Sequence, residues 1–385
     1  MIFKARAKPS PSSATEMRFF CSNCARSPID PLRHYRCPDC FHALDVSREN
    51  PATFPRDKIA ARAPTPWRYR EAMPDFAADL SLGEVQTPLL PFAIDGRQVL
   101  LKCDHTQPTG SYKDRGSALL MAYLQKAGTT SAAEDSSGNA GASLAAYAAR
   151  AGIHLQVFCP ETASKAKLAQ IELYGAELVA VAGARPRATE ALLKHVEKNG
   201  VTYASHLWNP LFIFGLRTLA YEIAEQLNWR APDAVLCPVG AGSILLGLYA
   251  GFCDLLAAGV VDAMPRLVAV QALNVSPLYS AWSSGATEVD VALNPTPTRA
   301  EGIALPQPVR GHQLLAALRQ SHGAVIAVDE ASIGEGIRAL GRGGLCVEPT
   351  AAVVWKGVKD YWNTCGQSDQ TVVAVLSGHG LKSLS

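Results

Sequence analysis

One lysine, Lys113, stands in a turn whose residue types could support covalent chemistry. It lies in residues 108–116, PTGSYKDRG, between an apolar run at 99–101 and a helical pattern that opens at 118–121. A lysine on such a strand-to-helix turn can form an imine with a carbonyl compound if its surroundings keep the amine neutral. The alternative is a solvated lysine at a helix start, and the other turns of the chain bear on the choice.

Three further turns leave predicted strands and enter helical patterns. Residues 136–141, SSGNAG, could bind a carboxylate through backbone N–H groups, or their serines could simply cap the helix. Residues 238–244, PVGAGSI, let the backbone approach a phosphate closely, although a glycine turn also serves packing. Residues 376–382, LSGHGLK, close the last strand, and a serine hydroxyl there could meet a ring nitrogen.

From about residue 80 the chain alternates between short apolar strands and helical patterns. This alternation predicts an α/β fold built on buried parallel sheets, with ligands bound at the carboxyl ends of the strands. The predicted strands are 99–101, 132–136, 153–158, 176–181, 201–204, 234–239, 267–272, 324–328 and 371–376. The predicted helices are 139–150, 164–174, 186–198, 213–227, 243–256, 332–340 and 350–362.

Four of the ten cysteines form two C-x2-C pairs near the N-terminus, with twelve residues between the pairs. Each pair can direct two thiolates at one point, so four thiolates complete a closed tetrahedral zinc site of structural type. An empty ribbon, or a redox or nucleic-acid role, is the alternative. The other six cysteines are scattered through apolar patterns and are predicted to be small buried residues of a cytoplasmic protein. The predicted metal ligands are Cys21, Cys24, Cys37 and Cys40.

Length and composition limit the remaining possibilities. The chain has 385 residues, 48% of them hydrophobic, and a formal net charge of +2, so charge gives no case for nucleic acid or membrane as a partner. No apolar run is long enough to span a bilayer. We expect a disordered tail at 1–16, a zinc-ribbon-like segment at 17–46 and a catalytic region at 47–385, which begins with an extended connector at 47–70.

The stretches PTGSYKDRG, SSGNAGAS and SGHGLK, in this order, resemble the pyridoxal-phosphate enzymes of the tryptophan-synthase-like fold type. Among these the likeness is greatest to the threonine synthases, some of which also carry a cysteine ribbon, and it covers roughly residues 17–385. The resemblance implies a two-domain open-sheet fold with a smaller mobile domain at about 112–205. It also implies a homodimer that acts on a small amino acid.

The same resemblance implies a role for each turn. Lys113 would form the Schiff base with pyridoxal phosphate, and Asn139 would contact the 3′ oxygen of the cofactor. Ser377 would face the pyridine nitrogen; a hydroxyl there cannot protonate the ring as an acid would, which suits elimination and replacement. The cofactor phosphate would be held by Gly240, Ala241, Gly242, Ser243 and Ile244, and the substrate carboxylate by Ser136, Ser137 and Gly138.

Two positions depart from the threonine synthase pattern and leave the substrate open. Phe212 stands where many of these enzymes carry an arginine that binds the substrate phosphate. Glu301 lies in a loop, RAEGIA, that is similar to that of ammonia-lyases, and it could approach the substrate amine. The leading hypothesis is conversion of O-phosphohomoserine and water to threonine and phosphate. The alternatives are an ammonia-lyase acting on threonine, serine or diaminopropionate, and a non-catalytic zinc-ribbon protein on an inactive scaffold.

Overall fold

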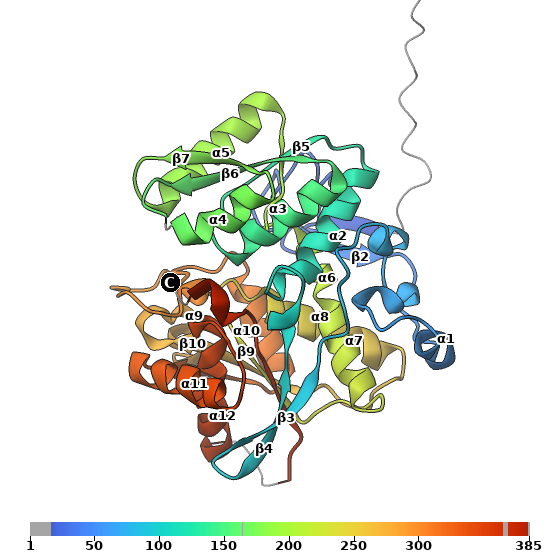
Figure 1. Ribbon diagram of the computed structural model, residues 1–385. Helices are drawn as coiled ribbons and strands as arrows, with labels where there is room; N and C mark the ends of the chain where they lie inside the picture. The colour runs from blue at the N-terminus through green and yellow to red at the C-terminus, as the bar shows by residue number, and fades with distance from the viewer. Residues whose placement is uncertain (1–16, 164, 365–368, 384–385) are drawn as a thin grey trace, which may run out of the picture.

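The protein, seen here in a computed structural model, is described over residues 17–163, 165–364 and 369–383. The predicted tail at 1–16 and one of the scattered cysteines, Cys365, lie outside these residues. The chain forms two lobes, each built around its own sheet, with a cysteine-bearing segment packed beside them (Figure 1).

The larger lobe contains a six-stranded sheet in the order β11-β10-β9-β12-β4-β3. Five strands run parallel, and the edge strand β3 runs antiparallel to β4. The register pairs Val373 of β12 with Leu100 of β4 and Ala234 of β9 with Arg266 of β10. The strands are β3 Leu89–Ile94, β4 Arg97–Lys102, β9 Ala234–Pro238, β10 Arg266–Ala272, β11 Ala324–Val328 and β12 Val372–Val375.

Alternate residues of these strands enter two different cores, as the two-residue repeat of a strand requires. Val235 and Cys237 belong to the core that also contains apolar residues of α6, α7, α8 and α10, which are Pro210–Gly215, Arg217–Gln226, Ser243–Ala257 and Gly311–Gln320. Ala234 and Leu236 belong to the second core, with residues of α11 and α12, Glu330–Arg342 and Pro349–Thr364. The short helix α9, Pro277–Ser283, contributes Leu278 to the first core. Both faces of the sheet are therefore covered, which explains why its central strands β9 and β12 are apolar along their length.

The smaller lobe is inserted between β4 and β9. Its sheet has the order β7-β6-β5-β8, and all its pairs are parallel. The long helix α2, Lys113–Lys126, leads into it and contacts both α3 and α6. The remaining elements are β5 Ser131–Glu134, α3 Asn139–Ala151, β6 His154–Pro160, α4 Lys165–Leu173, β7 Glu177–Val181, α5 Arg185–Asn199 and β8 Thr202–Tyr203. The predicted mobility of this smaller lobe, at about residues 112–205, stays a prediction.

Two expectations about the lobes are corrected by the structure. The sheets are not all parallel, because β3 forms a hairpin with β4; its Pro91 suits an edge strand. The helix predicted at 213–227 is two helices, since α6 ends at Gly215 and α7 begins at Arg217. A Cβ atom on Gly215 would lie 2.1 Å from the carbonyl oxygen of Arg115, so α6 ends where it packs directly on the backbone of α2.

The N-terminal segment is also more ordered than predicted. Strands β1 and β2, Met17–Phe20 and Asp45–Arg48, pair antiparallel, and β2 runs across the boundary predicted at residue 46. The expected extended connector at 47–70 contains helix α1, Arg56–Ala60, and two 3-10 turns, Pro66–Arg68 and Arg70–Ala72. It buries Trp67 and Tyr69 against the main core.

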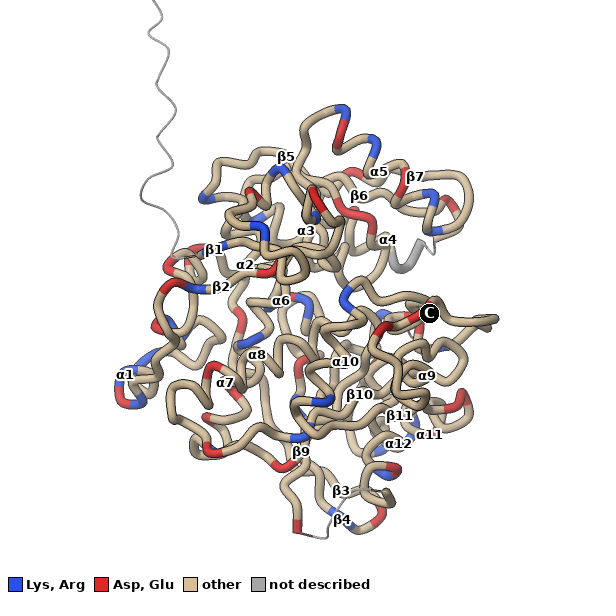
Figure 2. The backbone as a smooth tube through the Cα atoms, turned by 180° about the vertical axis from the view of Figure 1, so that it is seen from behind, with Lys and Arg blue, Asp and Glu red and all other residues tan. Residues whose placement is uncertain are grey.

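Basic and acidic residues are interspersed over both lobes, in keeping with the small net charge (Figure 2). Within the described residues, no helix combines the length and the apolar character that crossing a membrane requires.

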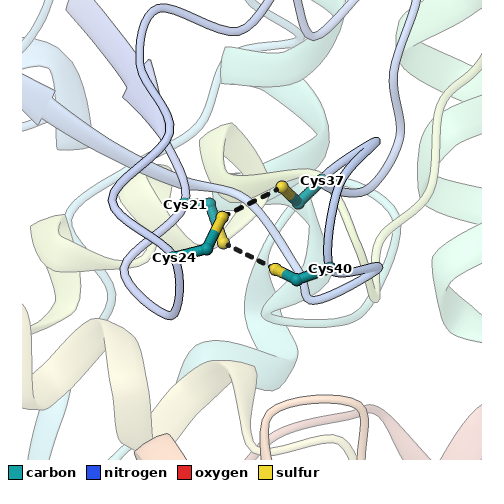
Figure 3. Close-up of side chains that lie close together, drawn as sticks. All are labelled: Cys21, Cys24, Cys37 and Cys40. Atoms are coloured by element: carbon teal, nitrogen blue, oxygen red, sulfur yellow. Dashed lines mark hydrogen bonds between the residues drawn. The ribbon is translucent and has the colours of Figure 1, made fainter.

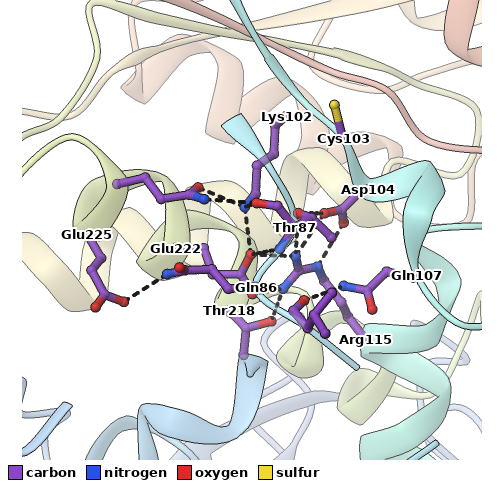
Figure 4. A network of polar contacts seen from close by, with 12 residues as sticks. Gln86, Thr87, Lys102, Cys103, Asp104, Gln107, Arg115, Thr218, Glu222 and Glu225 are labelled. Atoms are coloured by element: carbon purple, nitrogen blue, oxygen red, sulfur yellow. Dashed lines mark hydrogen bonds and ion pairs between the residues drawn. The ribbon is translucent and has the colours of Figure 1, made fainter. Parts of the chain in front are cut away.

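A buried network of four charged side chains anchors the start of α2. Arg115 pairs with Asp104 at 2.8 Å and with Glu222 of α7 at 2.7 Å, and Lys102 pairs with Glu222 at 2.6 Å (Figure 4). All four side chains are fully buried, so the two cations and two anions compensate each other away from water. Because Arg115 lies two residues after Lys113, this network fixes the helix turn that carries the predicted reactive lysine.

Candidate active site

Four strand ends meet at one cavity between the lobes. The cavity has a volume of about 690 Å³ and is lined by residues that follow β4, β5, β9 and β12. In parallel sheets the carboxyl ends of strands form the usual ligand site. Every predicted cofactor and substrate residue lines this cavity: Lys113, Ser136, Ser137, Gly138, Asn139, Gly240, Ala241, Gly242, Ser243, Ile244, Glu301 and Ser377.

Lys113 is the first residue of α2, and its amine lies against two aromatic rings. The Nζ atom is 4.6 Å from the ring centroid of Tyr112 and 5.7 Å from that of Phe212. The turn before it is held by Asp114, which accepts hydrogen bonds from the Thr109 N–H at 2.7 Å and the Ser143 hydroxyl at 2.6 Å. Burial raises the pKa of Asp114 to about 6.

The loop after β5 folds tightly over the start of α3. A Cβ atom at Gly141 would lie 1.8 Å from the carbonyl oxygen of Ser136, so only glycine permits this approach. Asn139, the first residue of α3, is held at both ends of its amide. Its nitrogen donates to Glu348 at 2.8 Å, and its oxygen accepts from the Lys382 amine at 3.1 Å.

The glycine turn after β9 leads into α8. Gly242 has a φ of +84°, a left-handed conformation that favours glycine, and a Cβ atom at Gly240 would lie 2.8 Å from the Ile303 backbone. The Ser243 hydroxyl lies 3.0 Å from that of Tyr112. The first backbone N–H groups of α8 have no partner within the helix and give its N-terminus a partial positive charge. No acidic residue in the first turn of α8 offsets this charge.

The turn after β12 presents Ser377 to the same space. Its hydroxyl is buried and lies close to the carboxylate of Glu348. The Ser377 carbonyl accepts from the Tyr112 N–H at 3.0 Å, so this turn and the lysine turn are joined. A Cβ atom on Gly378 would lie 2.2 Å from a carboxylate oxygen of Glu348, which places that carboxylate directly beside the turn.

Comparison with known proteins identifies the family. The model of the pyridoxal-phosphate dependent enzymes matches residues 80–378. This chain belongs to the pyridoxal-phosphate dependent enzyme family. It is 33% identical to the threonine synthase of Methanocaldococcus jannaschii over 336 residues, which cover 85% of this chain and 82% of that protein. It is likewise 33% identical to the Synechocystis threonine synthase, with 82% of each chain covered.

Solved structures of the same kind share the fold. A threonine deaminase from T.th. superposes with a TM-score of 0.66 at 28% identity, covering 76% of this chain and 92% of that one. Maize serine racemase superposes with a TM-score of 0.67 at 19% identity, over 77% and 88% of the two chains. These likenesses confirm the predicted α/β fold of this enzyme class and its dependence on pyridoxal phosphate.

The residues of this enzyme fit pyridoxal phosphate chemically. The buried Ser377 hydroxyl lines the cavity and can bond to the pyridine nitrogen. The α8 N-terminus, with its glycine turn and no acidic residue, suits the phosphate group. Lys113 supplies the primary amine in the same cavity. The individual roles assigned from the sequence stay predictions.

Sequence reasoning missed several polar residues of the cavity. Glu348 and Lys382 bind Asn139 directly, and burial raises the pKa of Glu348. His206 and Arg185 line the cavity from the small lobe. Glu348 sits alone between apolar residues just before a proline-initiated helix, a signal that could have identified it. His206 and Arg185 carry no comparable signal, because only the tertiary fold brings them to the cavity.

Phe212 and Arg217 occupy quite different surroundings. Phe212 is fully buried, and its ring lies beside Lys113 and His206. Arg217 pairs with Asp254 of α8 at 3.0 Å and lines a separate cavity near β2 and α10, so it does not replace an arginine at position 212.

The four N-terminal cysteines converge, as their spacing predicted. Their sulfur atoms all lie within 4.8 Å of one another (Figure 3). The Cys21 and Cys40 sulfurs are 3.4 Å apart, and those of Cys24 and Cys37 are 3.5 Å apart. Four thiolates at such spacing match the ligand set of a structural zinc ion.

Proposed function

We propose that this enzyme is a threonine synthase, which converts O-phosphohomoserine and water to threonine and phosphate. The observation that carries the proposal is the extent of the likeness. Relatives named threonine synthase align with this chain at 33% identity over more than four fifths of both sequences. The convergence of the four predicted turns on one cavity supports the same conclusion.

In the proposed reaction each turn has a defined task. Bound pyridoxal phosphate supplies an electron sink for the α carbon of the substrate. The Nζ atom of Lys113 takes the α proton and returns a proton later. Backbone N–H groups of residues 136–138 hold the substrate carboxylate, and those of residues 240–244 hold the phosphate of the cofactor. The Ser377 hydroxyl meets the ring nitrogen without protonating it, and Asn139 orients the ring through its 3′ oxygen.

The cavity also carries positive charge that suits a phosphorylated substrate. Arg185 lies at the start of α5, and Arg299 lies in the loop that carries Glu301; both line the cavity. We propose that these guanidinium groups take over the anion binding that Phe212 cannot perform.

A second candidate function is an ammonia-lyase acting on threonine, serine or diaminopropionate. Phe212 and the Glu301 loop favour it, and so does the 28% identity to a threonine deaminase. A substrate panel separates the two functions. We expect phosphate and threonine from O-phosphohomoserine, with little ammonia from serine or threonine. The converse pattern would establish the lyase, and Lys113→Ala serves as the inactive control in both assays.

We further propose a structural zinc ion in the N-terminal ribbon, held by Cys21, Cys24, Cys37 and Cys40. The converging sulfur atoms support it. A cytoplasmic homodimer is proposed on the strength of the family resemblance, and sedimentation of the purified enzyme tests the dimer.

A further inference from the structure

A buried acid and a histidine form a pair at the cavity that the proposed reaction has not used. The Nδ1 atom of His206 lies 2.5 Å from an oxygen of Glu134, whose side chain is fully buried. Glu134 ends β5, two residues before the loop proposed to hold the substrate carboxylate. His206 follows β8 and lines the cavity together with Lys113.

Glu134 differs from its neighbour Asp135 in its hydrogen bonds. The Asp135 carboxylate accepts hydrogen bonds from the hydroxyls of Tyr203 at 2.9 Å and Thr189 at 2.5 Å. Among the described side chains, Glu134 hydrogen-bonds to His206 and meets no comparable hydroxyl. Burying a carboxyl group costs free energy unless hydrogen bonds compensate for the lost water, and here the compensating side chain is His206. Glu134 therefore fixes the ring of His206, which lines the cavity, and leaves Nε2 as the nitrogen that can serve a substrate there.

We propose that His206, positioned by Glu134, is the acid–base catalyst for the side chain of the substrate, acting on the group that leaves and on the water that replaces it. The inference rests on the proposed elimination and replacement. It gives Lys113 the protons on carbon, which are the α proton and the proton that moves from Cβ to Cγ. It gives His206 the protons of the leaving phosphate and of the incoming water.

The surroundings favour a neutral pair that holds one shared proton. Burial raises the pKa of Glu134 well above its usual value, and Asp135 adds to this effect. Burial lowers the pKa of His206 well below its usual value, and the charges of Lys113 on α2 and Arg185 on α5 lower it further. Phe212 of α6 packs on the His206 ring, with centroids 6.0 Å apart, and contributes no charge. The resting proton thus lies on Glu134, and Nε2 of His206 carries its own hydrogen.

The protons balance over one replacement. As the bond from carbon to the leaving oxygen breaks, the phosphate departs with the bonding electron pair and takes the proton from Nε2 of His206. The shared proton moves from Glu134 to Nδ1, which leaves an ionised carboxylate beside a neutral ring. Lys113 carries one proton from Cβ to Cγ; when water then adds at Cβ, Nε2 takes a proton from the water and the shared proton returns to Glu134. Lys113 and Arg185 stabilise the carboxylate between these two steps.

The test compares two leaving groups on one carbon skeleton. O-phosphohomoserine releases phosphate, which needs a proton, whereas 2-amino-4-chlorobutanoate releases chloride, which needs none. General acid catalysis contributes about 10²–10⁴-fold, so His206→Gln should lower the rate of phosphate release by a factor in that range. In a single turnover, in which the later addition of water does not limit the rate, the same variant should leave chloride release nearly unchanged. Equal losses with both substrates would show that the pair only supports the fold, and would overturn the proposal.

A second readout does not depend on turnover. Nitrogen-15 spectra of the histidine rings report which ring nitrogen carries a proton, and His206→Gln assigns the relevant signals. We expect Nδ1 of His206 to accept a strong hydrogen bond from protonated Glu134 while Nε2 carries the ring hydrogen in the wild type, and the signal of this strong hydrogen bond to be lost in Glu134→Gln. Glu190→Gln on α5 is the control, because its carboxylate pairs with Lys194 at the surface, and it should preserve both the signature and the dependence on the leaving group.

The outcomes also separate this inference from the proposed function. If the wild-type enzyme releases no phosphate from O-phosphohomoserine, the proposed function is wrong. The leaving-group comparison is then made with serine and β-chloroalanine, which lose hydroxide and chloride. A selective loss of serine turnover in His206→Gln would still uphold the acid–base role, and an equal loss with both substrates would refute it.

Discussion

Replacing Glu222 with glutamine tests whether the buried charge network holds the start of α2. The substitution keeps the shape of the side chain but leaves the cations Lys102 and Arg115 with the single anion Asp104. Removing one partner from a fully buried ion pair costs about 3–5 kcal/mol. We therefore expect the free energy of unfolding to fall by about this amount, which urea denaturation followed by circular dichroism measures.

The pH dependence of this cost follows from Lys102. Burial lowers the pKa of Lys102 in the folded protein below its usual value of 10.5, and losing Glu222 lowers it further. The folded state then binds fewer protons than the unfolded state at pH values between the two pKa values, so stability rises with pH in that window. The cost of Glu222→Gln should accordingly be smaller at about pH 9 than at about pH 7.

A double substitution separates lost pairing from lost packing. Lys102→Met with Glu222→Leu removes one cation and one anion and leaves Arg115 paired with Asp104. Replacing a whole buried pair by apolar groups is often close to neutral, so the double variant should be more stable than Glu222→Gln alone. Glu190→Gln, on the exposed face of α5, should unfold like the wild type. If Glu222→Gln also unfolds like the wild type, the reasoning about this network is wrong.

Three further predictions concern individual residues. Burial raises the pKa of Asp114 from 3.8 to about 6. The folded state therefore binds more protons than the unfolded state between these pH values, and wild-type stability should fall by about 3 kcal/mol as the pH rises through them. Thermal unfolding of Asp114→Asn should not show this loss of stability with rising pH. The added methyl group of Gly378→Ala would lie 2.2 Å from an oxygen of Glu348, so we expect weaker binding of pyridoxal phosphate in an absorbance titration, whereas Gly341→Ala, where the new atom meets nothing within 4 Å, should bind normally. Zinc analysis of Cys37→Ser should show loss of the metal and a lower melting temperature, and retention of zinc by this variant would contradict the proposed ribbon site.

The sequence predicted the elements whose signal is local. The strand at 234–239 and the helix at 243–256 are apolar along their length and are separated by glycines, and both appear as β9 and α8 within a residue or two. The strand β3 was missed because it is an edge strand with several exposed residues and a central proline. The break between α6 and α7 was missed because it depends on the contact of Gly215 with α2.

The candidate site divides in the same way. Its turns combine glycine, small hydroxyl residues and a lysine at strand ends. Anion binding and a reactive amine could therefore be predicted from the sequence alone. Glu348, Lys382 and the pair of Glu134 and His206 are single polar residues whose partners lie far away in the sequence. The role of such residues can be inferred only from the fold, which brings them into contact with those partners.

The central claim is that Lys113 bonds covalently to pyridoxal phosphate, and borohydride reduction followed by peptide mass spectrometry tests it most directly. Reduction converts the imine to a stable amine and so marks the lysine that carried the cofactor. Lys382 offers a second amine at the same cavity, which makes the experiment decisive. We predict the label on Lys113 in the wild type and no label in Lys113→Ala; a label on Lys382, or an unlabelled wild-type chain, would contradict the account.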